Sequence, residues 1–101
     1  MSEVSRTARV GDVGEHVLIA EITRRLGQGQ SALVGIGDDA AVISLSEPSV
    51  AVSTDVLVQD RHFRLSWSTA SDIGHRVAGA NLADVAAMGA MPTCLVVGLV
   101  L

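Results

Sequence analysis

Cysteine, aromatic side chains and runs of basic residues are all scarce in this sequence. The single cysteine, Cys94, excludes an internal disulfide and suits a reducing compartment, so we expect a cytoplasmic protein. Aromatic residues make up only 2% of the chain, so its core must be built from Val, Ile, Leu, Ala and Met. The formal net charge is −4 without any basic run, which argues against nucleic acid or an anionic membrane as the principal partner. The negative charge does not exclude phosphorylated substrates, provided that a divalent cation lies between protein carboxylates and phosphate.

Long apolar runs are missing as well. The N-terminus lacks the apolar region of a signal peptide, and the most apolar run, residues 94–101, is too short to span a bilayer. With 101 residues, 49% of them hydrophobic, the chain can bury one modest core. We therefore expect a mobile arm over residues 1–11 and one domain over residues 12–101. The final run is typical of a buried strand, which predicts that the chain belongs to something longer or that a partner covers it.

Two helices are predicted, over residues 12–26 and 68–89. In the first, one apolar stripe is expected, with Asp12 as the N-cap and Gly27 after the last turn. The second is rich in Ala and Gly, with Ser68 or Ser71 as its cap and Gly89 at its end. Strands are predicted near residues 33–37, 40–45, 49–58 and 93–101. The fold class is thus α+β: a mixed, largely antiparallel sheet with the two helices packed on one face.

Residues 52–58 form the most informative of these strands. Ser53 and Asp55 share one face of an extended chain and Thr54 takes the other. A carboxylate inside an apolar run is costly unless something pairs with it. Asp55 therefore either ends a short strand and caps a turn, or has a partner elsewhere in the chain.

A glycine-containing stretch, residues 35–40, formally matches the dinucleotide fingerprint G-x-G-x-x-A. We reject that match because the fingerprint needs a helix directly after the glycines, whereas residues 41–43 predict another short strand. The stretch is better interpreted as a turn that presents Asp38 and Asp39. Adjacent carboxylates repel each other unless a cation or donor stabilises them, so the pair suggests Mg²⁺; an exposed acidic turn is the alternative.

Asp84 and His62 are the remaining candidates. Asp84 lies in the middle of an Ala-rich helix, where it has no capping role, so a buried or metal-facing position competes with a solvated one. Asn81 shares its face at a spacing of three residues. His62 follows the 52–58 strand and precedes the only Phe; a lone histidine of this kind is more often structural than functional.

Taken together, these motifs resemble the N-terminal domain of the thiamine-monophosphate kinases. These enzymes belong to a superfamily with aminoimidazole ribonucleotide synthetase and selenophosphate synthetase. The resemblance covers residues 14–101 and rests on five motifs in register: Gly14-Glu15, residues 35–42, Ser-Thr-Asp at 53–55 with His62-Phe63, Asp72-Ile73-Gly74, and residues 81–92.

The resemblance implies an enzyme that transfers the γ-phosphoryl group of ATP to thiamine monophosphate and forms thiamine diphosphate. It implies Mg²⁺ ligands at these positions: Asp39, with Asp38 beside it, Ser53, Thr54, Asp55 and Asp84. It also implies that His62 contacts the substrate and that two subunits pair their sheets in a homodimer. Phosphoryl transfer chiefly requires positioning and charge neutralisation, which carboxylates around Mg²⁺ provide, so no general base is assigned.

The chain departs from the family pattern in four respects. His16 stands where an aromatic residue is common. Ala83 stands where the helix motif usually has Ser, and residues 59–61 replace a more usual acidic-glycine run. The family also continues through a further nucleotide-contacting segment and a C-terminal domain, which this sequence lacks. Two alternatives to a complete kinase therefore stay open: a non-catalytic Mg²⁺-binding or dimerisation module, and a related enzyme such as selenophosphate synthetase.

Overall fold

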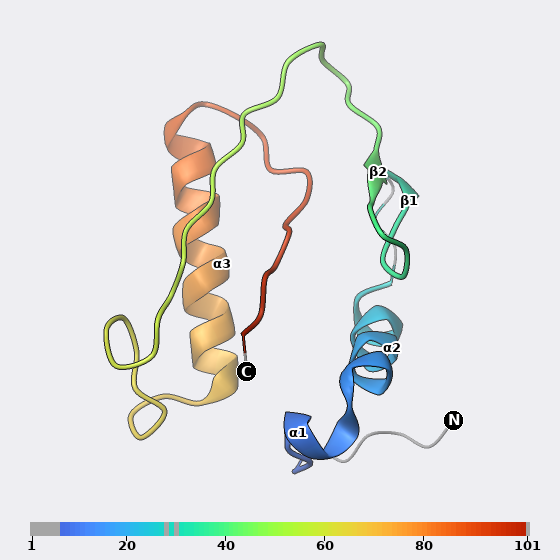
Figure 1. The fold of residues 1–101 in the computed structure, drawn as a ribbon. Helices are drawn as coiled ribbons and strands as arrows, with labels where there is room; N and C mark the ends of the chain where they lie inside the picture. The colour runs from blue at the N-terminus through green and yellow to red at the C-terminus, as the bar shows by residue number, and fades with distance from the viewer. Residues whose placement is uncertain (1–6, 28, 30, 101) are drawn as a thin grey trace. The chain divides into compact units, whose positions relative to one another are not determined.

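A computed structural model of the chain describes residues 7–27, 29 and 31–100 (Figure 1). The fold class is α+β, as predicted, with three α-helices and a two-stranded antiparallel sheet in the described residues. The chain divides into two compact units: Met1–Ser46 with Gly98–Leu101, and Glu47–Val97. Of the predicted arm, residues 1–6 lie outside the described part, and Val10 and Gly11 are helical.

The first unit begins with two helices, α1 (Val10–Val13) and α2 (Glu15–Leu26), where the sequence predicted one. Gly14 separates them because its φ of 82° is incompatible with a continuous helix. The assignment of Asp12 as N-cap was therefore wrong: Asp12 lies inside α1, and Gly14 is the N-cap of α2. The predicted end is confirmed, because Gly27 adopts a φ of 65° and donates its N–H to the Thr23 carbonyl at 3.0 Å.

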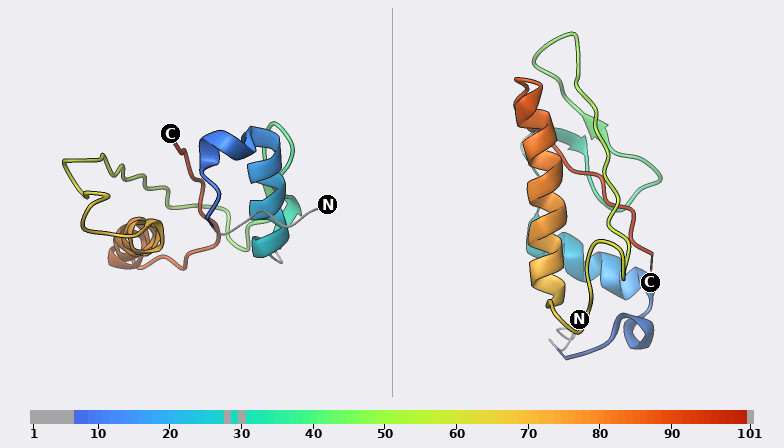
Figure 2. Two further views of the ribbon diagram at one scale, coloured as in Figure 1. Left: turned by 90° about the horizontal axis from the view of Figure 1, so that it is seen from below. Right: turned by 90° about the vertical axis from the view of Figure 1, so that its left-hand side faces the viewer.

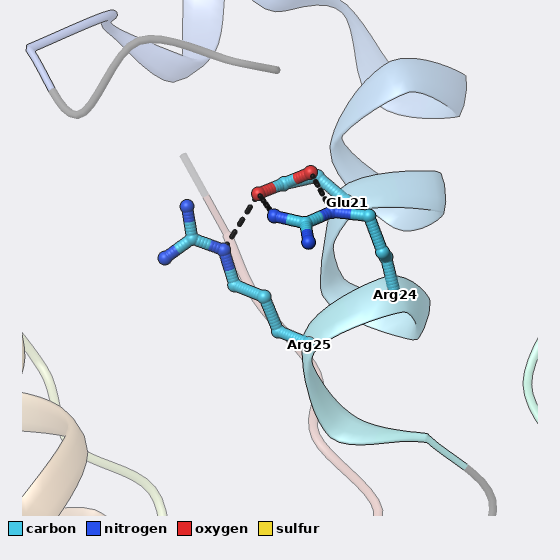
Figure 3. Close-up of polar contacts among 3 residues, drawn as sticks. All are labelled: Glu21, Arg24 and Arg25. Atoms are coloured by element: carbon cyan, nitrogen blue, oxygen red, sulfur yellow. Dashed lines mark hydrogen bonds and ion pairs between the residues drawn. The ribbon is translucent and has the colours of Figure 1, made fainter. Parts of the chain in front are cut away.

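A three-residue charge cluster lies on α2 (Figure 3). Glu21 accepts hydrogen bonds from Arg24 Nε and a terminal guanidinium nitrogen at 3.0 and 2.9 Å, and from Arg25 Nε at 2.6 Å. A glutamate three and four residues before its arginines is the favourable orientation on a helix. The hydrogen bonds from Arg24 and then Arg25 lower the pKa of Glu21 from 4.5 to about 2.

This cluster predicts an acid-sensitive α2. Because the pKa of Glu21 is lower in the folded chain, its stabilising contribution is present above pH 4.5 and disappears as the pH falls towards about 2. Helix content followed by far-UV circular dichroism should decline across that window in the wild-type chain. Glu21→Gln should flatten this decline, whereas Glu15→Gln, which leaves both arginine contacts in place, should not. Equal acid profiles for wild type and Glu21→Gln would contradict the assignment.

The sheet consists of β1 (Ala32–Val34) and β2 (Val42–Ile43), which pair antiparallel. Ala32 lies opposite Ile43 and Val34 opposite Val42, with an irregularity in register between the two pairs. Two of the predicted strands are thus confirmed in shorter form. The predicted packing of helices on one sheet face is not: among the described residues of the first unit, neither α1 nor α2 contacts the sheet. Strands of two and three residues offer too little surface to hold a helix.

In the second unit, α3 (Ala70–Ala87) is a single long helix (Figure 1). Its N-cap is Thr69, not Ser68 or Ser71. The Thr69 hydroxyl accepts the Asp72 N–H at 3.2 Å, and the Asp72 carboxylate accepts the Thr69 N–H at 2.8 Å. This reciprocal capping box satisfies two backbone donors that the helix leaves free. The Thr69 hydroxyl and backbone lower the pKa of Asp72, and Gly89, at a φ of 68°, follows the helix end as predicted.

Removing the cap should loosen the start of α3. Thr69→Ala deletes the hydroxyl that accepts the Asp72 N–H, and losses of this kind cost about 1 kcal/mol. We expect a lower midpoint for the loss of helical ellipticity in a urea titration. Ser71→Ala is the matched control, because its hydroxyl plays no part in the capping box. A midpoint shifted as far by Ser71→Ala as by Thr69→Ala would overturn the assigned cap.

The other two predicted strands, 49–58 and 93–101, are not strands in the described residues. Both segments run through the ribbon as chain without regular structure (Figure 2). A strand exists only where its N–H and C=O groups pair with a neighbour, and residues 49–58 and 93–100 have no such ladder here. Residue 101 lies outside the described part.

No residue of the described part is buried. Some apolar residues of the two unpaired segments are almost fully exposed, with Val52 at 84% and Val96 at 93%. Half-buried side chains on α3 include Ile73, Val77 and Val85, at helical spacing. Among the described helices, none combines the length and the apolar character that crossing a bilayer requires.

Candidate metal and phosphate site

The acidic turn lies in the first unit, between β1 and β2. Gly37 adopts a φ of 118°, a conformation that L-residues rarely take, and so allows the chain to reverse there. Asp38 and Asp39 follow it and are exposed, and Asp38 Oδ1 accepts the Asp39 N–H at 2.8 Å. No helix follows the glycines; β2 does. The predicted turn, and the rejection of the dinucleotide fingerprint, are therefore confirmed.

The Ser-Thr-Asp segment lies in the second unit on extended, unpaired chain. All three side chains are exposed, and Asp55 Oδ1 accepts the Val56 N–H at 2.8 Å. This local bond occupies one of the two carboxylate oxygens. In the described residues Asp55 thus neither ends a strand nor caps a turn, and its hydrogen bond is to the next residue rather than to a distant partner.

Asp84 and Ser53 line the same pocket, although thirty-one residues separate them in sequence. The pocket holds about 460 Å³ and is lined by residues of the 51–53 segment, of α3 and of its C-cap: Ala51, Val52, Ser53, Asp84, Val85, Ala87 and Met88. Asp84 is exposed, so the buried alternative is wrong and the solvated one fits, and the residue also lines the pocket. A metal-facing role stays a prediction. Asn81 does not line this pocket; its amide donates to the Val77 carbonyl at 2.8 Å.

The structure brings together only part of the predicted ligand set. Ser53 and Asp84 share the pocket, whereas Thr54 and Asp55 adjoin it in sequence without lining it. Asp38 and Asp39 belong to the first unit. Within residues 7–27, 29 and 31–100, no three His, Cys, Asp or Glu side chains gather closely enough to hold a metal ion.

The chemistry of these side chains suits a hard cation. Hydroxyl and carboxylate oxygens are the ligands that Mg²⁺ prefers, and the set contains neither sulfur nor nitrogen. Among the described residues, two ion pairs join Glu21 to Arg24 and Arg25, and neither involves the candidate carboxylates Asp38, Asp39, Asp55 and Asp84. The donor set of Ser53 and Asp84 is therefore compatible with Mg²⁺ bound between protein and phosphate.

His62 lies in the turn that follows the 52–58 segment. Its Nδ1 accepts the Val58 N–H at 2.8 Å, and the ring is otherwise exposed. The structure thus places His62 in a defined orientation and not in a core.

Two features of the second unit were missed from sequence. The apolar wall of the pocket, from Val52, Val85 and Met88, could have been anticipated from the spacing of Asp84, Val85 and Met88 on one helix. The Arg64 guanidinium also stacks over the Trp67 ring, 4.5 Å from its centroid. Their separation of three residues was the available signal.

Comparison with known proteins identifies relatives of this chain. The family model of the AIR synthase related protein, N-terminal domain, matches residues 37–101. A thiamine-monophosphate kinase of Mycobacterium tuberculosis is 48% identical over 86 residues, which are 85% of this chain and 26% of the relative. Thiamine-monophosphate kinases of Corynebacterium glutamicum and Escherichia coli are 45% and 39% identical, over 82% and 87% of this chain and 24% and 27% of their own lengths. No solved structure matches significantly.

The chain therefore spans about a quarter of the length of these curated relatives. The family match covers the acidic turn, the Ser-Thr-Asp segment, His62 and α3, which together carry every predicted site residue. This chain belongs to the family of AIR synthase related proteins, through their N-terminal domain.

Proposed function

We propose that this chain supplies the Mg²⁺-binding part of a thiamine-monophosphate kinase, which transfers the γ-phosphoryl group of ATP to thiamine monophosphate. The observation that carries the proposal is the shared pocket of Ser53 and Asp84, because it joins two predicted ligands from distant parts of the sequence. The names of the relatives supply the reaction and the substrate class.

In this proposal the residues of the chain act by binding and orienting. Asp84 and Ser53 hold a cation from the pocket, and Thr54 and Asp55 extend the same site. The acidic turn of Asp38 and Asp39, in the first unit, offers carboxylate oxygens to Mg²⁺ as well. Bound Mg²⁺ would neutralise charge on the phosphates during transfer. His62 contacts the substrate. No residue is assigned as general base, because transfer between phosphates mainly requires alignment and electrostatic stabilisation.

A chimera tests the function. The 86 aligned residues of this chain replace their counterpart in the M. tuberculosis relative, and thiamine diphosphate is measured with ATP and thiamine monophosphate, with and without Mg²⁺. We expect Mg²⁺-dependent product formation. A soluble chimera without activity would contradict the kinase proposal, and Mg²⁺ binding by such a chimera would favour the non-catalytic module.

We also propose that the protein is cytoplasmic and forms a homodimer. Support comes from the lone Cys94 and from the exposed apolar side chains of the unpaired segments, such as Val96 and Val97. Pairing between two copies would give these segments the ladder that the single chain lacks.

Sedimentation velocity checks the association. We expect a dimer whose fraction rises with concentration, and we expect Val96→Lys to shift the equilibrium towards monomer because a desolvated charge would lie in the interface. Glu47→Lys, a surface change outside these apolar segments, is the control. Monomer alone at high concentration would count against the dimer.

A further inference from the structure

Residues 58–63 form a turn in which the first and the last residue both accept backbone hydrogen bonds from within the turn. The N–H groups of Arg61 and His62 both donate to the Val58 carbonyl, at 3.1 and 2.9 Å. In return, the Asp60 N–H donates to the Phe63 carbonyl at 2.7 Å. Three backbone hydrogen bonds within six residues therefore define the course of the chain on which His62 sits.

Asp60 occupies the conformationally demanding position of this turn. Its φ is 64°, and it is the single non-glycine residue with a positive φ in the described part of the chain. Asp and Asn tolerate the left-handed region better than other side chains, whereas a β-branched residue is strongly disfavoured there. The identity of residue 60 thus decides whether the turn can close.

The closed turn determines the tautomer of His62. Its Nδ1 accepts the Val58 N–H at 2.8 Å, and a ring nitrogen that accepts a hydrogen bond carries no proton. The hydrogen of the neutral ring is therefore on Nε2. His75 shows the opposite arrangement: its Nδ1 lies 2.8 Å from the Ser71 carbonyl, which can only accept, so Nδ1 of His75 carries the hydrogen.

We propose that Asp60 is a positioning residue that holds His62 as its Nε2–H tautomer through the 58–63 turn. His62 then offers one neutral, directional N–H donor and no acceptor to a ligand. Such a donor suits an anionic acceptor oxygen, and on thiamine monophosphate this is a phosphate oxygen. Only the identity of this ligand rests on the proposed function.

Long-range ¹H–¹⁵N NMR of the histidine-labelled chain tests the tautomer. The signals are assigned with single His→Gln variants at positions 16, 62 and 75, in mildly alkaline solution where imidazole is neutral. We expect the ¹⁵N shifts of His62 to report a protonated Nε2 and a bare Nδ1, with the reverse pattern at His75. A protonated Nδ1 on His62 overturns the proposal.

Substitutions at and beside residue 60 test the positioning role. Asp60→Val should convert the His62 signals to a mixture of tautomers and leave His75 unchanged. Asp60→Asn tolerates the left-handed conformation and should preserve the wild-type pattern, as should Arg61→Val, which places the same β-branched side chain at a residue without positive φ. An unchanged His62 pattern in Asp60→Val overturns the role of Asp60.

The ligand is tested separately. Thiamine monophosphate added to the chimera should shift the His62 Nε2 signal, and unphosphorylated thiamine should not. No shift with thiamine monophosphate contradicts the substrate contact assigned under the proposed function. The tautomer measurement still decides the positioning proposal by itself.

Discussion

Replacing Asp84 by Asn in the chimera should lower the rate of thiamine diphosphate formation roughly 10²–10³-fold, the loss typical of removing one electrostatic contact to the transition state. The amide keeps the size of the side chain but removes the charge of a residue that lines the pocket with Ser53. The helix itself should be retained, because Asp84 lies outside the capping box of α3.

The control for Asp84→Asn is Glu47→Gln. It also removes one exposed carboxylate from the second unit, but Glu47 does not line the pocket. We expect its rate to stay near that of the unsubstituted chimera. If Asp84→Asn weakens cation binding, raising the Mg²⁺ concentration should partly restore its rate of thiamine diphosphate formation. Full activity in Asp84→Asn at low Mg²⁺ would remove Asp84 from the ligand set.

Gly37→Ala should distort the acidic turn and destabilise it by about 1–2 kcal/mol. The cost is one of backbone strain, because a φ of 118° is unfavourable for any L-residue. It is not a matter of crowding, since a Cβ built at Gly37 meets no atom within 4 Å. In the chimera, the displaced Asp38 and Asp39 should weaken Mg²⁺ binding and raise the Mg²⁺ concentration needed for half-maximal rate.

Gly35→Ala is the matched control for Gly37→Ala. It makes the same chemical change two residues earlier, where φ is not positive. We expect a much smaller change in thermal midpoint and in the Mg²⁺ requirement. Equal effects of the two substitutions would show that the conformation of Gly37 does not position the carboxylates.

Local sequence signals predicted the helices and turns well. The spacing of apolar residues located α2 and α3, and Gly27, Gly37 and Gly89 marked chain reversals because each has a positive φ. The residues that determine each of these helices and turns lie within a few positions of one another in the sequence. The misassigned caps also have local causes: Gly14 breaks the first helix, and Thr69 pairs with Asp72 more completely than Ser68 or Ser71 can.

Pairing between distant segments could not be predicted in the same way. Residues 52–58 have the composition of a strand, but composition does not provide the neighbour that a ladder needs. The pocket likewise depends on a contact between distant segments, which the sequence does not reveal. The sequence singled out Ser53 and Asp84 one at a time, and only the structure places them on one pocket. The carboxylates of the acidic turn remain predictions as ligands, because they belong to the other unit.

Paramagnetic Mn²⁺ provides the most direct test of the proposed metal site. Mn²⁺ replaces Mg²⁺ in the ATP-bound chimera labelled with ¹⁵N-aspartate, and line broadening is followed at substoichiometric metal. We predict that the amides of Asp55 and Asp84 broaden first, while Asp72 at the cap of α3 stays sharp. Broadening that affects Asp72 as strongly as Asp84, or that spares Asp84, would contradict a metal site built on the pocket of Ser53 and Asp84.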